Sequence, residues 1–382
     1  MKTIELMIKK RMKNLTVLLL AGVCLLCQPL QARQCIDACD GRTYKVGDTL
    51  RIGEPLSSGY LFVKQLNASN RFEKLNQKNL TGRIAIITDI PAYRPELYRQ
   101  FGIYQQPETP QIVFAEQGDF KIGVYLNMAL SKGNIVSRHH VSHMNGAVDL
   151  TPDILFAYAH KLYGKPIDTT SVDTYASLRA PQQYAEAAND PFALEELRTT
   201  YRKELEQAVA KADFNKVFRI KCFSKLQMYD INQQHFPLSD LKCIDVETKQ
   251  DEDLSKQGYC LWGTCAFHFT NAPSFATVPC DKHIAQGVYA MRKMISASLP
   301  IPAILYVYVR ILQQPVSLPD KRIMVMRPGT SFDYEWSTLS KAWGQKALDL
   351  EIIQTDGYYS VFPHNTQEVT YNYLGTQTVP EK

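Results

Sequence analysis

Short apolar or alternating runs, separated by Gly, Pro and Asn, dominate residues 43–136. Alternation with a period of two places successive side chains on opposite faces, which is typical of β-strands. Pro95 begins a single helical turn that we expect to stop at Gly102. So many short strands in one segment predict a small all-β domain, a barrel or a sandwich. The expected strands cover residues 44–55, 60–66, 83–90, 111–115 and 120–126.

The pattern changes to a helical period after a polar stretch at residues 137–146. Thr151 followed by Pro152 predicts the start of a helix that continues to Gly164. From 191 to 212, apolar residues recur three or four positions apart, and Asp190 is the expected N-cap. Each of these segments therefore predicts an amphipathic helix that packs one face against a core.

Strand patterns return from Val217 onward and surround one further predicted helix at residues 281–295. In the clearest strand, residues 303–312, Leu305 lies on one face while Tyr306 and Tyr308 lie on the other. We interpret the tyrosine face as the amphipathic side of a core strand, in preference to a ligand groove. The other expected strands cover residues 218–223, 226–231, 259–270, 323–326 and 350–353.

Together these patterns predict an α+β fold. A small all-β domain, a barrel or a sandwich, precedes a larger α+β domain with mainly antiparallel strands. The expected divisions are a signal peptide at 1–32, the small β domain at 33–138, a linker at 139–150 and the α+β domain at 151–382.

The N-terminus has the order of a secretory signal peptide. A basic stretch ends at Lys13, an uncharged apolar run follows at residues 15–27, and Ala32 supplies a small residue at the expected cleavage site. That run is shorter than the ~20 residues that a transmembrane helix needs, so we prefer cleavage to a retained anchor. We therefore expect an exported protein, periplasmic or extracellular, with no transmembrane segment after cleavage.

The net charge of +5 falls mostly in the expected signal, which carries five of the 43 basic residues and one of the 38 acidic residues. The mature chain is then nearly neutral. Because contacts with phosphates need a basic surface, we do not expect nucleic acid as a partner.

Seven of the nine cysteines follow the expected cleavage site, and an oxidising compartment favours disulfides among them. Cys260 and Cys265 are the candidate pair, because a four-residue loop between two strands would place them opposite each other. A two-residue turn at Gly263 and Thr264 would instead bring Trp262 opposite Cys265 and disfavour the bond. The spacing leaves both geometries open.

Three of the eight histidines gather in Ser137-Arg-His-His-Val-Ser-His-Met144, the segment with the most chemical character. His139 and His143 can approach one metal ion in either a helical or an extended backbone, but a third ligand is not identified. We therefore prefer an interdomain linker and expect no cofactor. Signatures of metalloproteases, lipases and nucleotide-binding enzymes, such as HExxH, GxSxG and GxxxxGK[ST], are absent from the sequence.

Three passages resemble exported bacterial envelope proteins of unknown function, which form no characterised family. They are YKVGDTLRIGEP with GYLFVKQL, then FKIGVYLNMALSKGNIV, and NDPFALEELRTTYRKEL. The resemblance implies an envelope or secreted setting and a β-rich module ahead of an α+β domain. It carries no residue with an assigned role.

The sequence favours a non-enzymatic binding or structural module with an envelope protein or other ligand as partner. One alternative is an exported hydrolase, with or without a metal bound by His139 and His143. Another is an assembly subunit that adds an edge strand at residues 370–374 to a partner's sheet.

Overall fold

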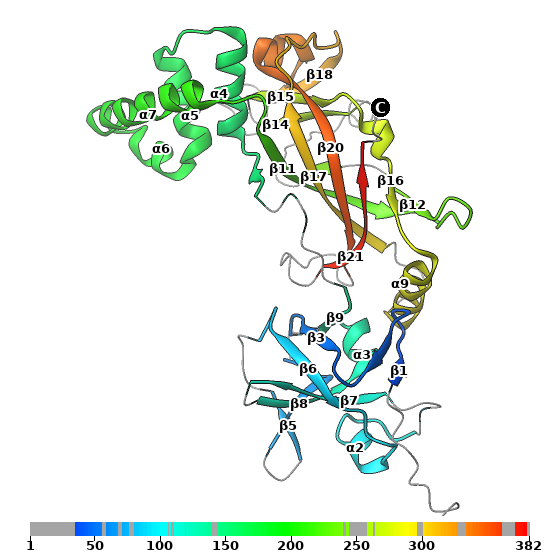
Figure 1. Cartoon of the computed structure of the whole chain (residues 1–382). Helices are drawn as coiled ribbons and strands as arrows, with labels where there is room; N and C mark the ends of the chain where they lie inside the picture. Colours follow the sequence, from blue (N-terminus) through cyan, green and yellow to red (C-terminus); the bar gives the residue numbers. More distant parts are fainter. Residues whose placement is uncertain are drawn as a thin grey trace, which may run out of the picture. The chain divides into compact units, whose positions relative to one another are not determined.

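The computed structural model divides into two compact units (Figure 1). The first unit contains the described residues up to Ala38 and from Arg42 to Ala129, and the second unit contains Cys39–Gly41 and the residues from Leu130. The structure describes residues 35–55, 59–67, 71–75, 80–105, 107, 111–118, 120–138, 142, 144, 146–239, 242–243, 258–262, 264–295, 301–326, 334–360 and 371–379.

The first unit is built on an antiparallel sheet with the strand order β5-β4-β8-β7-β6-β3. A separate pair of strands, β1 (Cys35–Asp37) and β2 (Thr43–Lys45), lies at its start. The strands of the sheet are β3 (Thr49–Ile52), β4 (Val63–Leu66), β5 (Phe72–Lys74), β6 (Ile84–Asp89), β7 (Ile112–Gln117) and β8 (Phe120–Tyr125).

The two faces of this sheet have different surroundings. One face is buried along its length and includes Val63, Ile87, Val113, Ala115, Ile122 and Val124. On the other face, α2 (Pro95–Arg99) packs over Ile112 and Tyr125, so this face is covered near that helix. Farther along β6 on this second face, Ile84 and Ile86 are about half exposed, at 52% and 51%. The helical turn predicted from Pro95 is confirmed as α2.

The second unit contains a larger sheet with the order β10-β11-β17-β20-β15-β14. Neighbouring strands are antiparallel except for β10 with β11 and β15 with β20, which run parallel. Two further strands pair with interior strands of this order, β13 with β11 and β21 with β20. The strands are β10 (Val148–Asp149), β11 (Val217–Leu226), β13 (Lys242–Cys243), β14 (Tyr259–Trp262), β15 (Cys265–Phe269), β17 (Ile301–Ile311), β20 (Ala347–Tyr359) and β21 (Asn372–Thr378).

Strand β17 is buried on both faces. Leu305, Val307 and Val309 have no exposed area, and Tyr306 and Tyr308 on the opposite face are only 5% and 2% exposed. Tyr306 and Tyr308 pack in a cluster with Tyr358 and Tyr371, against which Met144 and Ala147 also pack. The tyrosine face is therefore a second core surface.

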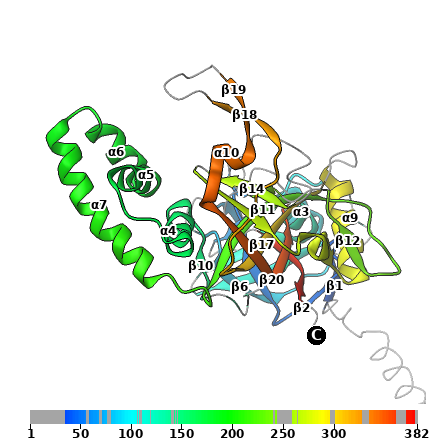
Figure 2. The same ribbon diagram turned by 90° about the horizontal axis from the view of Figure 1, so that it is seen from above.

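Helices α4 (Pro152–Tyr163), α5 (Thr169–Arg179), α6 (Pro181–Ala187) and α7 (Pro191–Lys211) lie to one side of this sheet (Figure 2). The prediction of α7 is confirmed, because the Asp190 carboxylate caps it by accepting hydrogen bonds from the amides of Phe192 and Ala193. Thr151 occupies the N-cap position of α4, but its side chain makes no capping hydrogen bond.

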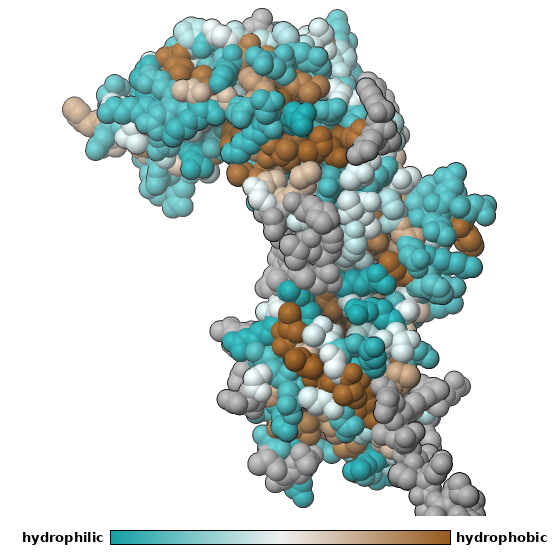
Figure 3. All heavy atoms as spheres, in the orientation of Figure 1, coloured by the Kyte–Doolittle hydropathy of each residue, from teal (hydrophilic) through white to brown (hydrophobic). Residues whose placement is uncertain are grey.

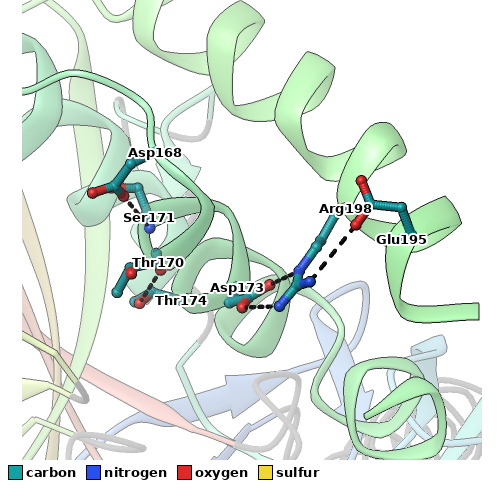
Figure 4. Close-up of polar contacts among 7 residues, drawn as sticks. All are labelled: Asp168, Thr170, Ser171, Asp173, Thr174, Glu195 and Arg198. Carbon is teal, nitrogen blue, oxygen red and sulfur yellow. Dashed lines mark hydrogen bonds and ion pairs between the residues drawn. The ribbon is translucent and has the colours of Figure 1, made fainter. Parts of the chain in front are cut away.

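A bidentate ion pair joins α5 to α7 (Figure 4). The guanidinium of Arg198 donates to both carboxylate oxygens of Asp173 at 2.7 Å, and Glu195 lies 3.7 Å from the same guanidinium. At the start of α5, the Asp168 carboxylate accepts a hydrogen bond from the Ser171 amide at 2.7 Å. Hydrogen bonds from Ser171, first from its side chain and then from its amide, lower the pKa of Asp168.

The turn Cys39–Gly41 packs closely against α9 (Lys282–Ile295) within the second unit. A Cβ at Gly41 would lie 2.5 Å from the carbonyl oxygen of His283, and a Cβ at Gly287 would overlap the carbonyl of Asp40. The other short elements are β9 (Ile135–Val136), β12 (His235–Pro237) paired with β16 (Thr277–Pro279), β18 (Arg322–Met326) paired with β19 (Tyr334–Thr338), α3 (Leu126–Ser131), α10 (Leu339–Trp343), η1 (Ala272–Phe275) and η2 (Gly344–Lys346).

The predicted fold class is confirmed, because an all-β N-terminal region precedes a region with helices and mostly antiparallel strands. Among the described residues, no helix combines the length and the apolar character that a membrane-spanning segment requires.

Candidate functional site

The metal candidates His139 and His143 lie outside the described residues. Within the described ranges, no group of three His, Cys, Asp or Glu side chains is arranged to hold a metal ion. The proposed metal site therefore stays a prediction from the sequence.

Cys260 and Cys265 lie in the hairpin of β14 and β15, where the register pairs Trp262 with Cys265 and Cys260 with Phe267. This is the second of the two geometries considered from the sequence, in which the two cysteines are diagonal neighbours. Diagonal neighbours of this kind are about 7–8 Å apart, with their Cβ atoms somewhat closer, which is too far for a disulfide without backbone movement. Burial raises the pKa of the Cys265 thiol to about 12.

The predicted edge strand at 370–374 falls partly in β21, where Asn372 pairs with Tyr359 and Tyr373 with Tyr358. One edge of these residues is therefore hydrogen-bonded to β20 within the chain. Tyr371 and Leu374 are buried, at 1% and 2% exposure.

The same β14–β15 hairpin contributes two members of a polar row that sequence reasoning missed. The register places Tyr259 opposite His268, and His268 opposite Asp349 on the parallel strand β20. Residues that are direct partners on adjacent strands present their side chains to the same face of a sheet. The Tyr259, His268 and Asp349 side chains, which we call the histidine row, therefore lie side by side.

The contacts of the histidine row fix the imidazole from two sides. His268 Nδ1 lies 3.2 Å from Asp349 Oδ1, and the Tyr259 ring stacks on the imidazole with centroids 4.4 Å apart and planes 21° apart. Gln314 Nε2 donates to the other carboxylate oxygen of Asp349 at 3.1 Å. The His268 side chain is 24% exposed and that of Asp349 15%.

The hydrogen bond to Asp349 determines which imidazole nitrogen is basic. A carboxylate that accepts from Nδ1–H leaves the lone pair on Nε2, where it can accept a proton. Burial raises the pKa of Tyr259, and the nearby negative charge of Asp349 adds to the effect, so the phenol stays neutral. The row thus consists of a carboxylate, an oriented imidazole and a neutral phenol. The spacing of 81 residues between His268 and Asp349 gave no local sequence signal.

A second candidate site is a hollow of about 360 Å³ in the first unit. It lies beside α2, on the face of β6, β7 and β8 that this helix covers in part. Leu97 and Phe114 supply apolar walls. Acidic and basic side chains share the lining, and Lys121 is paired with Glu116 at 2.8 Å. The lining residues, which we call the groove, are Leu66, Thr88, Asp89, Pro91, Arg94, Leu97, Phe114, Ala115, Glu116 and Lys121.

The exposed isoleucines of β6 are close to the groove. Ile84 and Ile86 share a strand face with Thr88, which lines the groove, and Ile86 is the direct partner of Glu116 in β7. Figure 3 shows hydrophobic surface in the region of this strand. The apolar surface of the first unit therefore extends from the groove along β6.

A family model described as a domain of unknown function (DUF4852) matches residues 168–291. The matched range includes Tyr259 and His268, while Asp349, Gln314 and the whole groove lie outside it. No curated protein and no solved structure matches the chain. The expectation that the chain resembles no characterised family is confirmed.

Proposed function

We propose that this is an exported protein whose first unit is a non-enzymatic module that binds an extended peptide segment of an envelope partner. The observation that carries the proposal is the groove together with the two half-exposed isoleucines beside it. Exposed apolar surface next to a cavity is a feature of interaction sites.

The size of the groove supports the binding of one bulky side chain. Its volume of about 360 Å³ lies at the small end of the ~300–1,000 Å³ that is common for ligand pockets. The strip formed by Ile84 and Ile86 prolongs the apolar contact beyond the hollow, which suits a ligand longer than a compact small molecule. A bulky apolar residue within a polypeptide fits this description, because its side chain can fill the hollow while the adjoining residues lie along the strip.

The charges of the groove favour a peptide over an anionic polymer. Arg94 and Lys121 face Asp89 and Glu116 in the same lining, so neither sign dominates. Nucleic acid and other polyanions require a surface with an excess of basic groups. A peptide backbone offers hydrogen-bond donors and acceptors in equal number, so it can bind both the acidic and the basic side chains of this lining.

A phage-displayed library of random linear peptides tests the proposal. We expect the selected peptides to share one bulky apolar residue and to bind Ile86→Asp at least about tenfold more weakly than the wild type. The matched control is Ile231→Asp, because Ile231 is also exposed, at 64%, but lies in the second unit. Failure to select peptides, or equal loss of binding in both variants, would refute the proposed site.

Export is supported by the signal-like N-terminus and is measured separately. Mass spectrometry of the protein from a bacterial periplasmic or secreted fraction should find a mature chain that starts at Arg33. Alkylation before and after reduction should then show oxidised cysteines among the seven that remain, as expected outside the cytoplasm. A full-length chain in the cytoplasmic fraction would contradict this part of the proposal.

A further inference from the structure

We propose that the histidine row is a hydrolytic site, at which His268 is the general base that activates water against a carboxylic ester with an apolar acyl or aryl group. The row belongs to the second unit, so this inference does not depend on peptide binding at the groove. It also does not involve the metal candidates His139 and His143.

The strand register holds the base in one orientation. Because His268 and Asp349 are direct partners on β15 and β20, the separation of Nδ1 and Oδ1 is set by a sheet and not by a loop. Sites built on strands hold their geometry more accurately than sites built on loops. An imidazole oriented by a carboxylate through Nδ1 is the arrangement that general-base catalysis uses.

Two further side chains act as positioning residues. Gln314 binds Asp349 Oδ2 and so leaves Oδ1 directed at His268. The stacked Tyr259 ring restricts rotation of the imidazole.

His160 lies in a different environment from His268. It is only 4% exposed, and its Nδ1 lies 3.4 Å from the backbone carbonyl oxygen of Lys165 and not from a carboxylate.

Apolar side chains adjoin the row and indicate the class of substrate. Tyr259 packs not only on His268 but also on the buried cluster that contains Leu261 and Ala347. Val316, Leu318 and Trp343 are partly buried against the same cluster. An acyl or aryl group would lose water-exposed apolar area by lying against this surface, which is favourable.

The reaction is balanced without any other reactant. Water donates a proton to His268 Nε2 as its oxygen forms a bond to the ester carbonyl carbon. The resulting tetrahedral intermediate breaks the bond to the alkoxy oxygen, and the imidazolium returns the proton to the leaving group. The products are a carboxylic acid and an alcohol, and the imidazole is restored.

The test uses p-nitrophenyl butyrate as the probe and the mature chain, residues 33–382, as the protein. We expect His268→Asn to lower the rate by about 10²-fold or more, as is usual for loss of a general base. The matched control His283→Asn changes an exposed histidine in α9 and should retain the rate. Equal rates for His268→Asn and the wild type would overturn the proposal.

Two measurements separate a catalytic role from a structural one. Gln314 is exposed, so Gln314→Ala should fold normally. Without the hydrogen bond from Gln314, the Asp349 carboxylate is held less firmly, so this variant should hydrolyse the ester about tenfold more slowly. Wild-type hydrolysis should show a solvent deuterium isotope effect clearly above unity, because a proton moves in the rate-limiting step. An isotope effect of unity with a burst of p-nitrophenol would indicate direct attack by the imidazole and would overturn the general-base assignment.

Discussion

Strand β6 of the first unit and strand β17 of the second unit both have apolar or aromatic residues on two faces, yet only β17 is covered on both. Ile84 and Ile86 are about half exposed, whereas Tyr306 and Tyr308 are almost fully buried. The difference arises from segments distant in sequence, because Met144 and Tyr371 help to close the tyrosine face of β17. An apolar strand face thus becomes buried core or exposed surface according to what the rest of the chain places on it.

The two units can be observed separately, which makes this comparison testable. All three tryptophans, Trp262, Trp336 and Trp343, belong to the second unit. Tryptophan fluorescence therefore reports the unfolding of the second unit alone, while far-ultraviolet circular dichroism reports both units.

The largest expected contrast is in thiol reactivity. Cys35 is exposed on β1, whereas burial raises the pKa of Cys265 to about 12. The thiolate is the reactive form, and each unit by which the pKa is raised lowers the thiolate fraction about tenfold. Iodoacetamide should therefore label Cys265 at least about a hundredfold more slowly than Cys35 near pH 8. Mass spectrometry of the reduced, folded protein measures both rates. Similar rates would show that the β14–β15 hairpin opens readily.

The second contrast compares truncations on the two strands. Leu305 has no exposed area, so Leu305→Ala should lower the free energy of unfolding by about 2–5 kcal/mol. Ile86→Ala, on the open face of β6, should change it by no more than about 0.5 kcal/mol. Urea titrations followed by tryptophan fluorescence and circular dichroism give the two values. A large loss for Ile86→Ala would mean that the strip is part of a core.

A smaller effect is expected where the turn Cys39–Gly41 meets α9. Alanine usually stabilises a helix relative to glycine, but a Cβ at Gly287 would overlap the Asp40 carbonyl. We therefore expect Gly287→Ala to destabilise the second unit by about 1–3 kcal/mol in the same fluorescence-detected urea titration. Gly146→Ala is the control, since nothing lies within 4 Å of its added Cβ. A more stable Gly287→Ala variant would contradict the close packing.

The smallest expected effect concerns the N-cap of α5, which belongs to neither β6 nor β17. Hydrogen bonds from the Ser171 side chain and amide lower the pKa of Asp168, so the folded protein has a lower value than the unfolded chain. The stabilisation is therefore complete above the unfolded pKa and disappears as the pH falls through the folded value. Asp168→Ala should have a slightly lower Tm than the wild type near neutral pH, and the difference should vanish in strong acid. Asp168→Asn, which still accepts the hydrogen bond, should show less pH dependence.

Elements with strong local signals could be predicted from the sequence. Asp190 and Pro191 mark the start of α7, and its apolar residues repeat with a helical period, so its position was predicted within a residue. Helices α5 and α6 were missed, because neither presents a clear apolar stripe. They are held by contacts such as the one between Arg198 and Asp173, which joins residues 25 positions apart.

The candidate sites were harder to predict from the sequence than the helices. The sequence drew attention to the hairpin of Cys260 and Cys265, but the pairing of His268 with Asp349 depends on a parallel contact between β15 and β20. Parallel neighbours are joined through long connections, so no local pattern records them. The groove likewise combines residues from α2 and several strands, and its members look like ordinary surface positions in the sequence.

The turn Cys39–Gly41 makes the two units inseparable by a single cut. Three residues near the start of the expected mature chain belong to the second unit, while the 88 residues that follow them belong to the first. A fragment that begins at Leu130 would lack the Asp40 backbone against which Gly287 packs. Expression of the second unit alone therefore requires an added peptide with residues 39–41, or a circular permutation that restores them next to α9.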